Sequence, residues 1–147
     1  MKINRVQSGK TLFASLLCLL IISTVITGCS KDDDDNNGPG SGAAEVVAGT
    51  YKGQLSVGGE EFYDAIIIAT DEGDSKVKFA AKSGEAYSDV TPQTMLAKSI
   101  GASASAGIIA QGANGTFSFD PETKYIVMYT TKTADTDIEF SFQGTKQ

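Results

Sequence analysis

Alternation of apolar and polar residues is the dominant pattern in residues 44–147. In residues 50–57, 76–82 and 138–143, every second side chain is apolar or glycine, and those between are polar, charged or small. Because successive side chains of a strand point to opposite faces, this pattern predicts three strands that each bury one face.

The buried faces of these strands carry the aromatic residues that we expect in the core. Tyr51 and Phe79 lie on the buried faces of the first two strands. Ile138, Phe140 and Phe142 share one face of the third, and the polar residues between them are left outside. A shift of one residue in any of these strands would exchange the two faces.

Three further strands are predicted between these segments. Residues 61–70 end in a run that is apolar on both faces, as in a central strand, and residues 116–119 and 124–131 form a hairpin. Glycine, aspartate and proline mark the turns at residues 58–59, 71–74 and 120–123.

Residues 91–101 break the alternation and predict one short helix. Thr91 is a suitable N-cap residue, Pro92 suits the first helical position, and Gly101 suits the residue after the helix. Leu96 and Ile100 are four residues apart, which would place them on one helical face.

These elements predict an all-β domain at residues 44–147. About eight short antiparallel strands, separated by tight turns, are typical of a small β-barrel or a two-sheet sandwich. The expected fold is one of these two, with one short helix.

The first 28 residues predict a secretory signal peptide. Lys2, Arg5 and Lys10 precede the uncharged apolar run at residues 12–22. The run ends in Ile26-Thr27-Gly28-Cys29, which resembles a bacterial lipobox. That resemblance implies cleavage before Cys29 and attachment of acyl chains, such as palmitate, to this residue. The alternative is a transmembrane anchor, because residues 11–28 are uncharged and barely long enough to span a bilayer.

Residues 29–43 predict a flexible tether that holds the domain away from a membrane. The segment is rich in Asp, Asn, Gly and Ser and has too little apolar surface to fold alone. Its beginning resembles the surface-export signal of lipoproteins in Bacteroidota. The matching positions are Lys31, Asp32, Asp33, Asp34 and Asp35. The resemblance implies an outer-membrane protein that faces the cell exterior.

The ends of the domain resemble a known family of barrels. Residues 49–55 read GTYKGQL, and residues 140–146 read FSFQGTK. Both resemble the calycin-like, lipocalin-like domain of Bacteroidota lipoproteins, with Gly49-x-Tyr51 where lipocalins carry Gly-x-Trp. The resemblance implies a β-barrel that binds a ligand.

Composition excludes several kinds of chemistry. The chain has 147 residues, no His, and only Cys18 and Cys29 as thiols. It therefore has no Ser-His-Asp triad, no Cys-His dyad and no set of His or Cys ligands for zinc. The net charge of −6 becomes −9 when Lys2, Arg5 and Lys10 leave with the signal peptide. This acidic balance argues against nucleic-acid binding.

Carboxylates are the remaining groups with catalytic or metal-binding chemistry. They cluster near two turns, which predicts that they are exposed and ionised. The favoured interpretation is therefore that these residues are ordinary solvated turn residues. The two alternatives are a hydrolase that uses a pair of carboxylates and a weak calcium site. The two clusters are Glu60, Glu61 and Asp64, and Asp71, Glu72 and Asp74.

The sequence therefore predicts a binding protein without a catalytic residue, a metal site or a cofactor other than the lipid on Cys29. Tyr63, Tyr87, Tyr125 and Tyr129 are candidates for an exposed contact surface. The expected ligand is a small apolar molecule, a glycan or an outer-membrane protein, and the binding residues stay unknown. The alternative function is a structural or accessory subunit of an outer-membrane complex.

Overall fold

The computed structural model describes residues 42–103 and 105–147. The chain divides into two units, Met1–Asn36 and Asn37–Gln147, and all described residues belong to the second. The predicted signal peptide at residues 1–28, the lipidation site Cys29, Lys31 and the acidic residues 32–35 lie outside the described residues.

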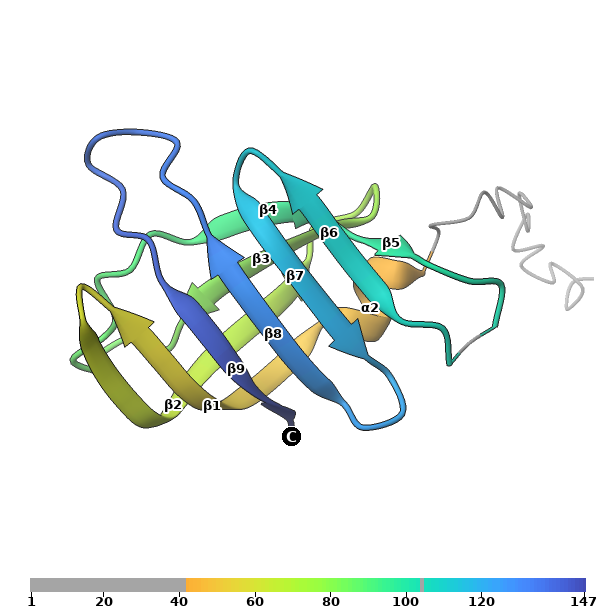
Figure 1. Ribbon diagram of the computed structural model, residues 1–147, viewed down its shortest axis with the longest axis horizontal. Helices are drawn as coiled ribbons and strands as arrows, with labels where there is room; N and C mark the ends of the chain where they lie inside the picture. The colour runs from red at the N-terminus through yellow and green to blue at the C-terminus, as the bar shows by residue number, and fades with distance from the viewer. Residues whose placement is uncertain (1–41, 104) are drawn as a thin grey trace, which may run out of the picture. The chain divides into compact units, whose positions relative to one another are not determined.

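Nine antiparallel strands and one short helix make up the described domain (Figure 1). The helix, α2, spans Ala43–Val47 and precedes all the strands. The strands are β1 (Gly49–Val57), β2 (Glu60–Asp71), β3 (Lys76–Ala81), β4 (Gln93–Leu96), β5 (Lys98–Ser99), β6 (Ile108–Gly112), β7 (Gly115–Asp120), β8 (Tyr125–Thr130) and β9 (Ser141–Lys146).

The sheet curls into a nearly closed barrel. Its strand order is β4-β3-β2-β1-β9-β8-β7-β6-β5, so β4 and β5 lie at opposite edges. Only Ala97 separates these two strands in the sequence, which forces the two edges to meet. Asn114 Nδ2 donates a hydrogen bond of 2.8 Å to the Thr94 carbonyl across this seam. The predicted all-β fold is confirmed, and of the two expected architectures the barrel is the one observed.

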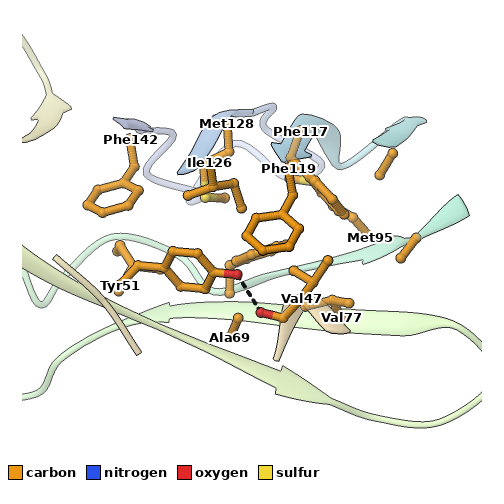
Figure 2. Close-up of a cluster of buried hydrophobic side chains, with 14 of the residues drawn as sticks. Val47, Tyr51, Ala69, Val77, Met95, Phe117, Phe119, Ile126, Met128 and Phe142 are labelled. Atoms are coloured by element: carbon orange, nitrogen blue, oxygen red, sulfur yellow. Dashed lines mark hydrogen bonds between the residues drawn. The ribbon is translucent and has the colours of Figure 1, made fainter. Parts of the chain in front are cut away.

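Aromatic side chains from different parts of the barrel wall meet in its interior. The rings of Tyr51 and Phe119, from β1 and β7, lie 6.0 Å apart, and those of Phe79 and Phe117, from β3 and β7, lie 5.2 Å apart. Figure 2 shows several of these side chains packed between the strands. Protein atoms therefore occupy this part of the interior, where some other barrels of similar strand number hold a small ligand.

Helix α2 adds three buried side chains to this core. Ala43, Ala44 and Val47 are buried, and the helix packs against β2, β3 and β5. The Tyr51 hydroxyl donates a hydrogen bond of 2.5 Å to the Val47 carbonyl, as Figure 2 shows. Helix α2 begins at Ala43, one residue before the predicted start of the domain at residue 44.

The helix predicted at residues 91–101 is wrong. Residues 93–96 instead form β4, which pairs with the edge of β3. Gln93, Met95 and Ala97 are buried, whereas Leu96 is 62% exposed and Ile100 is 65% exposed. Pairing with β3 gives the backbone N–H and C=O groups of this segment hydrogen-bond partners and buries alternate side chains. Tertiary contacts therefore override the local helix signals.

The predicted faces of the other strands agree with their burial, with one exception. Tyr51, Phe79, Phe140 and Phe142 are all buried. Ile138 was expected on the same inward face but is 40% exposed, because β9 begins only at Ser141. The Ile138 backbone instead bonds Thr91, in the connection that leads to β4.

The predicted turns form as expected. Gly58 and Gly59 both have positive φ angles, 59° and 89°, in the two-residue turn between β1 and β2. Asp120 Oδ1 accepts hydrogen bonds from the Glu122 and Thr123 amides between β7 and β8. Contacts with Thr123 and Glu122 lower the pKa of Asp120 below its ordinary value.

Candidate functional site

A groove crosses the outer face of the barrel over β2, β1, β9 and β8. The strand register explains its position, because Ser56 lies beside Glu61 on one side and Ser141 on the other. Ser141 in turn lies beside Tyr129. These four outward side chains form one row across neighbouring strands. The row spans about 14 Å, which is three interstrand spacings.

The difference in size along this row produces the hollow. Ser56 and Ser141 are short and form the floor, whereas Glu61 and Tyr129 are long and form the two walls. The hollow has a volume of about 260 Å³, and Gln54, Val127 and Gln143 also line it. A second hollow of about 250 Å³ shares Ser56, Tyr129 and Ser141 with the first and extends to Gly58 and Glu139. We call the two together the outer groove.

A chain of hydrogen bonds orders the amide side chains at one end of the groove. The Tyr125 hydroxyl donates to Gln143 Oε1 at 3.3 Å, and Gln143 Nε2 donates to Gln54 Oε1 at 3.0 Å. This chain leaves the Gln54 Nε2 group as its terminal donor. The orientation of both amides thus follows from the network.

Several polar groups of the groove have no protein partner. Within residues 42–103 and 105–147, Gln54 Nε2 and the hydroxyls of Ser56, Ser141 and Tyr129 form no hydrogen bond to another residue. Tyr129 is 60% exposed, so its ring is also accessible. The groove therefore presents an aromatic surface together with donors and acceptors for a ligand.

Tyr63 forms a hydrogen bond with the carboxylate of Glu61, the residue that forms one wall of the groove. Its hydroxyl donates to Glu61 Oε2 at 2.7 Å, and this contact raises the pKa of Tyr63 above its ordinary value. A β-bulge places Tyr63 outward, because Tyr63 and Asp64 together oppose Gln54 in the β1–β2 ladder. Asp64 adopts a φ of 64° at this bulge.

The carboxylates of the first predicted cluster point to different partners. Glu61 bonds Tyr63, whereas Asp64 forms an exposed ion pair with Lys52 at 3.1 Å. Glu60 is also exposed, beside the β1–β2 turn. The structure thus brings only Glu61 into the groove.

The second predicted cluster is likewise held by its own neighbours. Asp71 Oδ1 accepts a hydrogen bond of 2.8 Å from the Gly73 amide, which is ordinary turn chemistry. The Glu72 carboxylate lies 3.8 Å from the Lys78 ammonium, and that of Asp74 lies 3.9 Å from Lys76. Among the described residues, no three Cys, Asp or Glu side chains are grouped to hold a metal ion.

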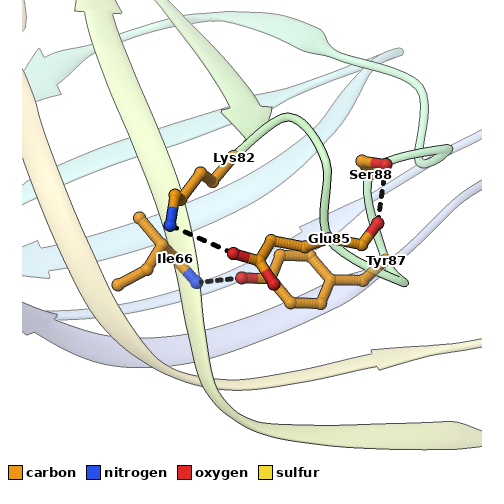
Figure 3. Close-up of polar contacts among 5 residues, drawn as sticks. All are labelled: Ile66, Lys82, Glu85, Tyr87 and Ser88. Atoms are coloured by element: carbon orange, nitrogen blue, oxygen red, sulfur yellow. Dashed lines mark hydrogen bonds and ion pairs between the residues drawn. The ribbon is translucent and has the colours of Figure 1, made fainter.

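The four candidate tyrosines differ in exposure. Tyr63 is 71% exposed, and Tyr125 and Tyr129 are also exposed on the outer face. Tyr87 is instead buried in the connection between β3 and β4, where its hydroxyl accepts a hydrogen bond of 2.9 Å from the Ile66 amide (Figure 3). Tyr87 also packs against Phe62, with ring centroids 5.4 Å apart. It is therefore a structural residue.

Figure 3 also shows how this connection is fixed around Tyr87. The Lys82 ammonium lies 3.0 Å from the Glu85 carboxylate, and the Ser88 hydroxyl donates to the Glu85 carbonyl at 2.7 Å. The contact with Glu85 raises the pKa of Lys82. These two contacts lie within the connection, and the hydrogen bond between Tyr87 and Ile66 joins the connection to β2.

The sequence did not single out Gln54, Ser56, Ser141 and Gln143 as site residues. Their outward orientation could be predicted from the alternation, but their proximity depends on β1 pairing with β9. The one local signal was the choice of Ser and Gln, rather than Lys or Glu, at outward positions.

In the part of the chain that the structure describes, no helix has the length and apolar character needed to cross a bilayer. Comparison with protein-family models, curated proteins and solved structures gives no match for this chain.

Proposed function

We propose that this chain is a lipid-anchored lipoprotein of the outer membrane, displayed on the cell surface, whose barrel is a non-catalytic binding module. The lipobox-like segment ending at Cys29 and the acidic tether that begins at Lys31 support the anchoring and the surface location. The resemblance of the tether to an export signal implies that the barrel faces the exterior, and the resemblance to calycin-like lipoproteins implies that the barrel binds a ligand.

The outer groove is the observation that carries the binding function. It combines the exposed ring of Tyr129 with hydroxyl and amide groups that have no partner among the described residues. Tyrosine with small polar residues is the composition that recognition surfaces commonly use, because tyrosine supplies large contact area at low entropic cost. The interior is a poorer place for a ligand, since aromatic rings meet across it.

A photo-cross-linking residue at position 139, where the exposed Glu139 lines the groove outside its serine floor, tests the binding function in cells that produce the full lipidated chain. Position 122, between β7 and β8, is the matched control, because Glu122 is also an exposed glutamate and does not line the groove. A discrete adduct formed from position 139 and not from position 122 supports a binding module. Equal labelling from both positions, or none from either, would overturn it.

Cys29→Ser tests the anchor separately. The variant should lose palmitate labelling and accumulate as uncleaved precursor, whereas Cys18→Ser should be processed normally. Normal lipid labelling of Cys29→Ser would contradict the lipoprotein assignment.

A second candidate function is that of an accessory subunit in an outer-membrane complex. The filled interior favours it, as do Leu96 and Ile100, which are largely exposed near the barrel seam. Thr94, Leu96, Gln111 and Asn114 contribute to a hollow of about 210 Å³ at this seam. Adducts with a membrane protein formed from position 96, and none from position 139, would favour this function over the first.

A further inference from the structure

We infer that the ligand of the outer groove is an uncharged carbohydrate chain. This inference rests on the proposed binding function and adds the chemical class of the ligand. Three properties of the groove carry it: its charge, the polarity of its lining and its shape.

The charge of the groove disfavours anionic ligands. Glu61 and Glu139 are its charged side chains, and neither hollow is lined by Lys or Arg. Lys52, on the neighbouring part of β1, is paired with Asp64. Phosphate, sulfate or a fatty-acid carboxylate would meet acidic groups here without a compensating cation.

The lining of the groove disfavours apolar ligands. Gln54, Ser56, Ser141 and Gln143 present polar groups, and Phe142 turns its side chain into the core. An alkyl chain placed here would cover the unpartnered hydroxyls without bonding them, and such desolvation is unfavourable.

A sugar satisfies both kinds of surface that the groove offers. Its hydroxyls are uncharged and both donate and accept, so they suit Gln54 Nε2, the two serine hydroxyls and the Glu61 carboxylate. Its C–H groups form an apolar face that can pack on the exposed ring of Tyr129. Tyr63 keeps Glu61 in place through its 2.7 Å hydrogen bond and is therefore a positioning residue.

The shape of the groove fits a chain of sugars better than a protein surface. The two hollows, about 260 and 250 Å³, share their serine floor and follow one another along the strands. Each is close to the lower limit for small-molecule sites, about 300 Å³. A stable protein interface covers about 800 Å² on each partner, which is a much broader surface.

Binding to an immobilised array of oligosaccharides tests this inference directly. The probes are uncharged oligomers of glucose, galactose, mannose and xylose, with uronic-acid oligomers as the charged counterpart. The full chain is used, in a detergent without a sugar headgroup. We expect at least one uncharged series to bind, with an affinity that changes little between low and high salt.

Three variants locate the binding in the groove. Tyr129→Ala should weaken binding about tenfold through loss of the stacking surface. Ser141→Leu should abolish binding by filling the floor, whereas Ser118→Leu makes the same change outside the groove and should leave binding intact. Thermal unfolding of each variant shows whether it remains folded. Equal affinity of wild type and Ser141→Leu would overturn the inference.

Tyr63→Phe tests the positioning of Glu61. The variant removes only the hydroxyl that bonds the carboxylate, so it should weaken sugar binding severalfold while the melting temperature stays within a degree of the wild type. Unchanged affinity would show that Glu61 is not held for the ligand.

Different experimental outcomes would contradict the proposed ligand class and the proposed binding function. Binding of the uronic-acid oligomers alone, or binding of no oligosaccharide, would overturn the carbohydrate ligand. If position 139 still gave a specific adduct in cells, now with a protein, the binding module would remain and its partner would be a protein. If position 139 gave no specific adduct, the proposed function itself would fail.

Discussion

Tyr51 connects three parts of the domain through one side chain. It lies on β1, its ring packs edge-on against Phe119 of β7, and its hydroxyl bonds the Val47 carbonyl in α2. The side chain is fully buried, and this burial raises the pKa of Tyr51 above its ordinary value of 10.0. Both the packing and the ionisation of this residue should therefore affect stability.

Tyr51→Phe should reduce the free energy of unfolding by about 1–3 kcal/mol at pH 7, because the Val47 carbonyl loses its partner. Above pH 10 the unfolded wild type releases the phenol proton while the folded chain keeps it. Unfolding of the wild type is then favoured by rising pH, and its advantage over Tyr51→Phe should shrink.

Urea unfolding of both proteins from pH 7 to pH 11 measures this effect. Lysines and the other tyrosines titrate in both proteins, so their effects cancel in the difference between the two free energies of unfolding. A difference in stability that stays constant across this range would contradict the predicted ionisation behaviour.

Phe140 and Glu139 provide a second comparison at the level of single residues. Phe140 is buried, and Glu139 beside it is exposed on the outer face. Phe140→Ala should cost about 3–5 kcal/mol by leaving a cavity, and Glu139→Ala should change stability by less than about 0.5 kcal/mol. Thermal and urea unfolding measure both, and equal losses would mean that the two faces are exchanged.

Close packing of β1 against β9 depends on two glycines that face each other. Gly53 is the register partner of Gly144. A Cβ added at Gly53 would collide with the Gln143 carbonyl, and one at Gly144 would collide with the Lys52 carbonyl. Because the collisions are with backbone atoms, rotation of a side chain cannot relieve them. This contact joins the first and last strands of the barrel.

Gly53→Ala should therefore destabilise the domain by about 1–3 kcal/mol, through displacement of β9 from β1. Gly112→Ala is the matched control, since a Cβ at Gly112 meets no atom within 4 Å. Denaturant unfolding compares the two variants. If Gly112→Ala were as destabilising as Gly53→Ala, loss of glycine itself, and not the close contact, would be the cause.

At the scale of the whole molecule, the proposed function depends on where the barrel is displayed. The outer groove is exposed to a ligand outside the cell only if the chain reaches the outer leaflet. Lys31, Asp32, Asp33, Asp34 and Asp35 resemble an export signal, and removal of the proposed signal peptide would change the net charge of the chain from −6 to −9. An acidic domain is repelled by anionic lipid, so attachment would rest on the acyl chains.

Replacement of Lys31 and the four aspartates at residues 32–35 with alanine should lower antibody labelling of intact cells, while total protein stays constant. Asn36→Ala with Asn37→Ala is the matched control within the same segment and should label like the wild type. Unchanged labelling of the first variant would show that the charged run acts only as a spacer.

The sequence by itself determined the elements whose signals are local. Alternation predicted the faces of β1, β3 and β9, since a strand turns each successive side chain to the opposite side. Gly58-Gly59 and Asp120-Pro121 predicted their turns, because the backbone angles and side-chain bonds of a turn depend on neighbouring residues. Composition alone also excluded chemistry that needs histidine.

Only the tertiary structure decided the features that depend on distant residues. Residues 93–96 form a strand because they can pair with the edge of β3. One residue separates β4 from β5, so the two edges of the sheet lie together and the sheet forms a barrel. Ser56 and Ser141 lie far apart in the sequence and form one floor only because β1 and β9 are neighbours. The pairing of strands is a non-local contact, set by the packing of the whole core, and the candidate site follows from that pairing.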